Sequence, residues 1–160
     1  MAQQDFDAGC AFINRLKSNP KLKDFDEAAV KQAIILPLLN IMGWDTANIE
    51  EVYPEYAIEK NRVDYALRLY GRPEFFLEAK KPREDLESHE EQLLNYSFRQ
   101  GFKLAGLTNG VTWLFYPPLK EGSWSERRFY AIDILEQKIE DAAGKFIEIL
   151  ANFSKSMKDY

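Results

Sequence analysis

Residues 62–80, RVDYALRLYGRPEFFLEAK, contain two apolar runs joined by a short polar connection. The runs at 62–68 and 74–80 have the composition of strands, which predicts an antiparallel hairpin. If its loop is centred on Gly71, residues whose numbers sum to 142 lie opposite each other. In that register one face is wholly apolar and suited to a core: Val63, Tyr65 and Leu67 meet Ala79, Leu77 and Phe75.

The other face of this hairpin carries charged residues. We expect Arg68 across from Glu74, and Asp64 across from Glu78, with Lys80 the next side chain beyond Glu78. Two carboxylates opposed at a Cβ separation of about 5 Å repel each other. A hard cation between them removes that repulsion, and Mg²⁺ takes one or two protein carboxylates while leaving positions open for phosphate oxygens. The spacing therefore predicts a metal site beside which Lys80 adds positive charge for a phosphate ester.

The alternative is that Asp64, Glu78 and Lys80 are ordinary charges on a solvated sheet face, because an Asp followed later by Glu-x-Lys is common. Their context favours the metal site. The strands adjoin, the charges share a face whose reverse is apolar, and a polar helix is expected at about 84–99.

The remaining chain predicts helices at both ends and strands between them. Helical patterns cover about 4–17, a segment that opens near Asp24 and ends before Gly43, and about 134–157. Further strands are expected at 55–59, 104–108 and 111–116, with Asn109-Gly110 as a hairpin turn. No linker, low-complexity tract or repeat divides the 160 residues. We therefore expect one domain, 1–160, of the α/β class, with a central mixed sheet that contains an antiparallel meander and is flanked by helices.

Composition excludes several classes of function. The chain has one cysteine, Cys10, and one histidine, His89, too few for a four-ligand zinc site, an intrachain disulfide or an ordinary Cys-His pair. No apolar run is long enough to span a membrane and no signal peptide is apparent, so we expect a cytoplasmic location without membrane contact. The net charge of −5 argues against holding nucleic acid by bulk charge alone.

Three strings together resemble the PD-(D/E)xK nuclease superfamily: VDYAL at 63–67, FLEAKK at 76–81 and QLLNY at 92–96. More narrowly, the chain is similar to the amino-terminal nuclease domain of type I restriction enzyme R subunits. GWD at 43–45 and LTNG at 107–110 extend that similarity. The resemblance implies a restriction-endonuclease-like core.

Two features depart from the family pattern. Val63 stands where the superfamily name has Pro. The chain also contains no Gly-x-x-x-x-Gly-Lys-Ser/Thr sequence, so the ATP-driven translocase of a complete R subunit is not expected in it. We therefore expect a nuclease-like module without a motor.

Carried onto this chain, the resemblance implies roles for individual residues. Asp64 and Glu78 would bind Mg²⁺, or Mn²⁺ in its place, and Lys80 would position or activate the attacking water. Gln92 would support the site from the following helix. Together these residues form the expected catalytic set.

The resemblance also implies that Glu27 is a helix glutamate that joins the metal site. Asp24-x-x-Glu27 equally fits a helix capping box, so both interpretations stay open. Glu55 is a rival ligand, because counting back through the Lys60-Asn61 turn places it on the face of Asp64.

The site together with this resemblance implies Mg²⁺-dependent endonuclease cleavage of DNA phosphodiester bonds in restriction-modification. DNA would be the substrate, and a helicase, translocase or methyltransferase would be the protein partner. The alternative is a catalytically inactive nuclease-fold module that binds DNA or a protein. The acidic flanks and the missing motor favour that alternative.

Overall fold

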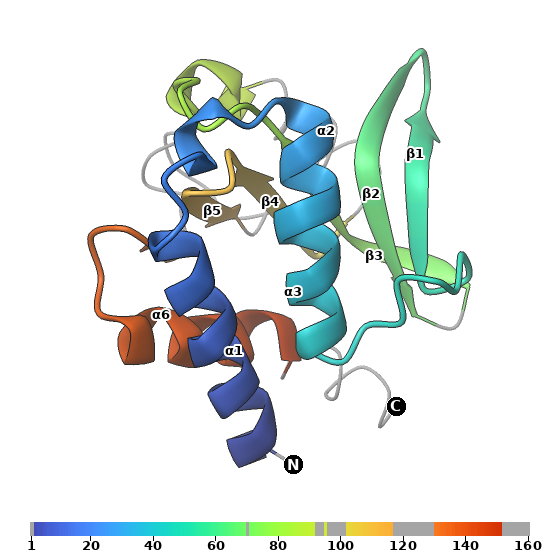
Figure 1. The fold of residues 1–160 in the computed structure, drawn as a ribbon. Helices are drawn as coiled ribbons and strands as arrows, with labels where there is room; N and C mark the ends of the chain where they lie inside the picture. The colour runs from blue at the N-terminus through green and yellow to red at the C-terminus, as the bar shows by residue number, and fades with distance from the viewer. Residues whose placement is uncertain (1, 70, 92–94, 96–101, 117–129, 152–160) are drawn as a thin grey trace.

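A six-stranded mixed sheet forms the centre of the computed structural model, which describes residues 2–69, 71–91, 95, 102–116 and 130–151 (Figure 1). The strands lie in the order β1-β2-β3-β4-β5-β6. Neighbouring strands are antiparallel except β3 and β4, which are parallel. The expected α/β class and mixed sheet with an antiparallel meander are confirmed. The strand bounds are β1 Val52–Ile58, β2 Asn61–Leu69, β3 Arg72–Ala79, β4 Leu104–Thr108, β5 Thr112–Tyr116 and β6 Tyr130–Asp133.

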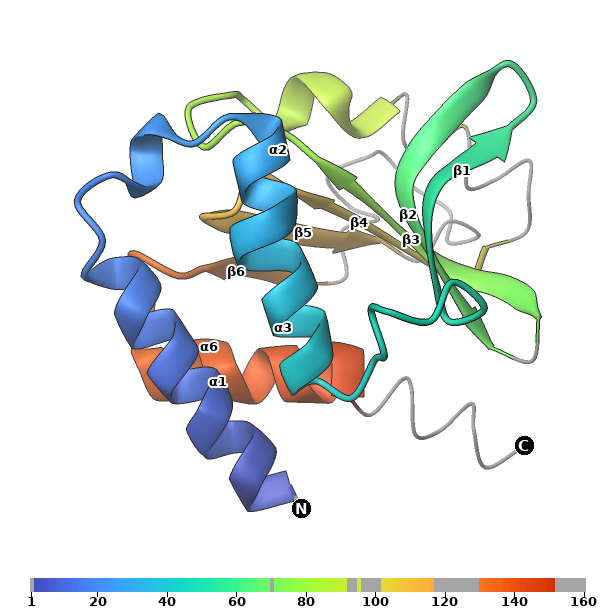
Figure 2. The ribbon, with the colours of Figure 1, turned by 45° about the vertical axis from the view of Figure 1, so that its right-hand side comes forward.

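Helices cover the sheet and pack against one another. Figure 2 shows α1, α2 and α3 on one side of the strands, and α6 crosses near α1 and α3. In the part of the chain described, no helix is long and apolar enough to span a membrane. The helix bounds are α1 Ala2–Lys17, α2 Glu27–Val30, α3 Leu36–Ile41 and α6 Ile139–Phe146.

Two apolar clusters fill the two sides of the sheet. The larger one lies between the sheet and the helices and includes Leu67 and Leu77 of the central hairpin together with Ile34. The smaller one contains Ala66 and Phe76, the residues that alternate with them along the strands. Because successive side chains of a strand point to opposite faces, the sheet is buried on both sides at its centre.

The predicted register of the central hairpin is confirmed over its middle. Tyr65 pairs with Leu77 and Leu67 pairs with Phe75, as a loop at Gly71 requires. A β-bulge between Leu67 and Arg68 then shifts the pairing, so that Arg68 meets Pro73. The predicted pair of Arg68 with Glu74 is therefore wrong, because an extra residue on one strand changes the register beyond it.

The apolar face was predicted correctly except at Val63. Five of its six residues belong to the larger cluster, whereas Val63 packs in the smaller one. The regular alternation of side chains between the two faces of β2 is interrupted at Asp64. At this point the pairing of β2 with β3 has ended, and β2 continues in register with β1 alone. That register pairs Pro54 with Tyr65 and Tyr56 with Val63, so Glu55, which has a left-handed φ of 51°, falls opposite Asp64.

The helix that faces this hairpin begins later than expected. Its N-cap is Asp26, whose Oδ1 accepts a hydrogen bond from the N–H of Ala29 at 2.7 Å. Asp24 instead closes the short 3₁₀ turn Leu22–Asp24, so the predicted capping box of Asp24 with Glu27 is wrong. Glu27 is the first residue of α2 and has no capping role of that kind.

A wide turn connects α2 and α3. Residues Lys31–Ile35 form a π-helical turn in which the N–H of Leu36 donates to the carbonyl of Lys31. Pro37, at the start of α3, has no N–H for an ordinary helical bond. The structure thus places an irregular turn directly before Pro37.

The other predicted elements are confirmed in part. Asn109-Gly110 begins the turn between β4 and β5, and Gly110 has φ of 88°. The polar helix expected at 84–99 starts as the 3₁₀ turn Glu87–His89, and most of its remainder lies outside the described residues. The strand β6 was not predicted, and the last helix starts at Ile139 rather than at 134.

Candidate active site

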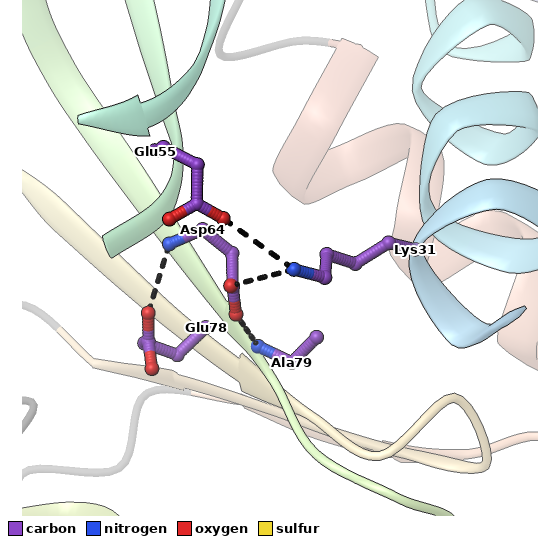
Figure 3. A network of polar contacts seen from close by, with 5 residues as sticks. All are labelled: Lys31, Glu55, Asp64, Glu78 and Ala79. Atoms are coloured by element: carbon purple, nitrogen blue, oxygen red, sulfur yellow. Dashed lines mark hydrogen bonds and ion pairs between the residues drawn. The ribbon is translucent and has the colours of Figure 1, made fainter. Parts of the chain in front are cut away.

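The candidate site lies where β2 and β3 separate. Their last backbone pair is Tyr65 with Leu77, and beyond it side chains bridge the two strands. The N–H of Asp64 donates to Glu78 Oε1 at 2.8 Å, and the N–H of Ala79 donates to Asp64 Oδ2 at 2.7 Å (Figure 3). Each carboxylate thus binds the backbone of the opposite strand, and the structure brings together the two acidic residues predicted from the sequence.

A lysine from the facing helix completes this network. Lys31 Nζ lies 3.1 Å from Asp64 Oδ1 and 3.6 Å from Glu55 Oε1, so its ammonium group bridges two carboxylates (Figure 3). The side chain of Asp64 is only 14% exposed, that of Lys31 24% and that of Glu55 55%. The contact with Asp64 is therefore shielded from water, and that with Glu55 lies at the surface.

Glu78 is the most perturbed acid of the site. Burial first, and then the negative charge of Asp64, raise the pKa of Glu78 from its ordinary value of 4.5 to about 8. The N–H of Asp64 and the charge of Lys80 act in the opposite direction, and Glu27 adds a smaller upward effect. The repulsion between the two carboxylates expected from the sequence is therefore present.

Lys31 remains a cation in this environment. Burial disfavours its charge, but the hydrogen bond to Asp64 and the negative charges of Asp64 and Glu55 outweigh burial and raise the pKa of Lys31. One positive group and two acids thus stabilise each other beside Glu78.

Lys80 follows directly after the last residue of β3. Its backbone N–H donates to the carbonyl of Thr108 at 2.8 Å, which ties it to the end of the parallel neighbour β4. Its side chain is half-buried, and its charge favours the ionised form of Glu78. Lys80 therefore acts electrostatically on Glu78, and its role in the site stays a prediction.

Within the described part of the chain, the remaining residues that the sequence assigned to the site form no hydrogen bond or ion pair with Asp64 or Glu78. Glu27 is half-buried at the start of α2, and its charge is felt at Glu78. Glu55 contacts Lys31. Among the described residues, no three His, Cys, Asp or Glu side chains converge as a metal-ligand cluster. Gln92 lies outside the described residues.

Comparison with known proteins identifies the fold that carries this site. No family model matches the chain. A solved structure, of the type IIG restriction endonuclease BpuSI, superposes with a TM-score of 0.53 at 16% identity and covers 84% of this chain. The chain has a restriction-endonuclease-like fold.

A curated relative also belongs to a restriction system. The type II restriction enzyme and methyltransferase RM.Eco57I of Escherichia coli is 31% identical over 101 residues, which cover 53% of this chain. The chain spans 10% of that protein and 17% of the BpuSI chain. Both proteins are described as type II enzymes, so the narrower resemblance to type I R subunits stays a prediction.

The residues of this restriction-endonuclease-like fold suit a hard divalent cation. Asp64 and Glu78 offer carboxylate oxygens from adjoining strands, and Mg²⁺ takes one or two such carboxylates and keeps water in its other positions. Positive charge between them would offset their mutual repulsion, which adds to burial in raising the pKa of Glu78. The donor set therefore fits Mg²⁺ or Mn²⁺ on its chemistry.

Sequence analysis missed Lys31. Its contact with Asp64 joins residues 33 positions apart, on a helix and a strand, and no periodic pattern indicates such a contact. The available signal was its spacing from Glu27. Residues four apart share a helix face, so the face that carries a candidate metal ligand also carries this lysine.

Proposed function

We propose that the chain is the nuclease module of a restriction-modification system, a Mg²⁺-dependent endonuclease that hydrolyses DNA phosphodiester bonds. The observation that carries this proposal is the bridging of β2 and β3 by Asp64 and Glu78, with Lys80 next along the chain. The restriction-endonuclease-like fold and the restriction enzyme among its relatives support it.

The chain's own residues would divide the work of hydrolysis. Asp64 and Glu78 would hold the cation through their carboxylates. When bound, Mg²⁺ polarises a phosphoryl oxygen and lowers the pKa of a bound water. Lys80 would orient the attacking water and stabilise the negative charge that develops on the phosphate. Gln92, which the resemblance assigns to the site, would support it.

The finer identity is also part of the proposal. The motifs at 63–67 and 76–81 support a module like that of type I R subunits. A helicase, translocase or methyltransferase would deliver DNA to it. The E. coli relative, described as both restriction enzyme and methyltransferase, supports such an association.

Cleavage of closed-circular plasmid DNA tests the proposal, because a circle has no ends and only internal cleavage relaxes it. We expect nicking by the purified chain with Mg²⁺ or Mn²⁺, none with EDTA, and a loss of about 10²-fold or more in Lys80→Ala. Lys81→Ala is the matched control, because Lys81 is the exposed neighbouring lysine. Equal activity in wild type and Lys80→Ala, or none in either folded protein, would refute catalysis by this site.

A second candidate function is a catalytically inactive module that binds DNA or a protein. The observation that favours it is Lys31, whose ammonium already neutralises Asp64. Calorimetry with Mg²⁺ separates the two functions. Uptake that disappears in Asp64→Asn supports the nuclease, whereas no uptake at millimolar Mg²⁺ supports the inactive module.

A further inference from the structure

Lys31 has no role in the proposed hydrolysis, yet among the described residues its contact with Asp64 is the closest between two side chains of the candidate site. Its Nζ lies 3.1 Å from Asp64 Oδ1, and the side chains are 24% and 14% exposed. Exposed ion pairs contribute little because water and entropy offset them. A contact as shielded as this one has a larger effect on what else can bind Asp64.

The backbone holds this lysine in place. Lys31 opens the π-helical turn, and its carbonyl accepts the N–H of Leu36. Val30 and Ile34 on either side of it are fully buried, with 0% and 1% exposure. Single π-helical turns occur frequently at functional sites. The turn therefore fixes the base of the side chain on the helix that faces the separated strands.

The oxygens of Asp64 are both occupied in this arrangement. Oδ2 accepts the N–H of Ala79, and Oδ1 binds Lys31. The bond from the N–H of Ala79 links β3 to β2 and involves a fixed backbone group. The contact with Lys31 depends on the end of a flexible side chain. Of the two, the lysine is the partner that a cation would displace.

We propose that Lys31 is a built-in counter-ion, which occupies the cation position at Asp64 in the metal-free protein and competes with the divalent ion for it. This inference rests on the proposed function, since it assumes that Asp64 binds the ion. It makes Lys31 a positioning residue rather than a catalytic one. Lys31 stabilises the metal-free site and weakens its affinity for the metal.

A purely structural salt bridge predicts a different outcome. Its loss would lower the stability of the fold and leave metal affinity unchanged or weaker, because Asp64 would be less well held. If Lys31 competes with the metal, its loss changes stability and metal affinity in opposite directions. Removing Lys31 would lower the stability of the metal-free protein and raise its affinity for the metal.

Isothermal titration of the full chain with Mn²⁺ alone, and then Mg²⁺ alone, measures this competition. We expect Lys31→Met to bind at least about fivefold more tightly than wild type, and its metal-free melting temperature to be lower. Lys31→Gln, which keeps a hydrogen-bond donor without the charge, should show the same gain and covers a failure of Lys31→Met to fold. Lys81→Met controls for the loss of one positive charge nearby and should change affinity much less.

Unchanged or weaker binding in both Lys31 variants overturns the inference and leaves the proposed metal site intact. Absence of binding in wild type and variants overturns the inference together with the metal dependence of the proposed function. A gain that survives Asp64→Asn also overturns it, because the ion would then bind elsewhere.

Discussion

The backbone N–H of Asp64 donates a hydrogen bond to the side chain of Glu78 across the gap between β2 and β3, at 2.8 Å. The side chain of Asp64 in turn accepts the N–H of Ala79, the residue after Glu78. These bonds replace the backbone pairing that ends at Tyr65. The acids therefore serve as structural links between strands, and their charges are fixed within reach of each other.

The first prediction concerns the charge of Asp64. Replacing it in Asp64→Asn removes the largest charge effect on Glu78 but leaves its burial, so the pKa of Glu78 should fall below about 8 and stay above 4.5. Carboxyl chemical shifts followed by NMR during a pH titration measure this. Glu27→Gln should lower the pKa of Glu78 by less, because Glu27 has the smallest effect named. An unchanged pKa in Asp64→Asn would contradict the coupling.

The second prediction concerns stability and pH. The folded protein holds the proton of Glu78 up to about pH 8, whereas the unfolded chain releases it near 4.5. This group therefore stabilises the fold at low pH, and its contribution is lost as pH rises through that window. Glu78→Gln stays neutral, so its advantage over wild type in free energy of unfolding should grow between these values and level off above them. Urea unfolding with EDTA present measures it, and parallel curves would refute it.

The third prediction tests the N-cap of α2. Asp26→Ala removes the acceptor for the N–H of Ala29 and should cost about 1 kcal/mol of unfolding free energy. Asp24→Ala is the matched control, because Asp24 forms an exposed ion pair with Arg83 and its loss should cost little. Chemical denaturation of both variants decides the point. The reverse order of effects would restore the capping box that the sequence suggested.

The fourth prediction concerns Gly110, which supports the helix bearing Lys31. Its φ is 88°, and an added Cβ would lie 2.8 Å from Ile34 Cδ1. Gly110→Ala should therefore cost about 1–3 kcal/mol through backbone strain and overpacking. Gly144→Ala in α6 is the control, since no atom beyond its chain neighbours and its own helix backbone lies within 4 Å of its added Cβ, and it should gain about 0.5–1 kcal/mol. Equal stability of the two variants in urea would contradict this account.

Local pattern predicted the features that depend on neighbours in the chain. The turn at Gly71 and the alternation on either side of it were enough to pair Tyr65 with Leu77 and to place Asp64 near Glu78. The register failed at Arg68, because a β-bulge inserts a residue without changing the apolar pattern that surrounds it. The cap was assigned to the wrong aspartate, since Asp24 and Asp26 are equally suited by type.

Contacts between distant elements could not be predicted in this way. Lys31 reaches Asp64 only because a helix packs against the sheet through the apolar cluster around Ile34. The position of that helix depends on the complete core rather than on any short motif. For the same reason, the sequence left open whether Glu27 or Glu55 would be a further metal ligand.

The left-handed conformation of Glu55 on β1 has a consequence for how copies of this chain behave in concentrated solution. Among the strands that the structure describes, β1 lies at one end of the sheet, and exposed outer strands are templates for aggregation. Pro54 has no N–H to donate, and Glu55 turns the backbone out of the extended conformation. A strand from another molecule cannot continue the ladder past this point, so the same distortion that holds Glu55 beside Asp64 also discourages fibril growth from this side.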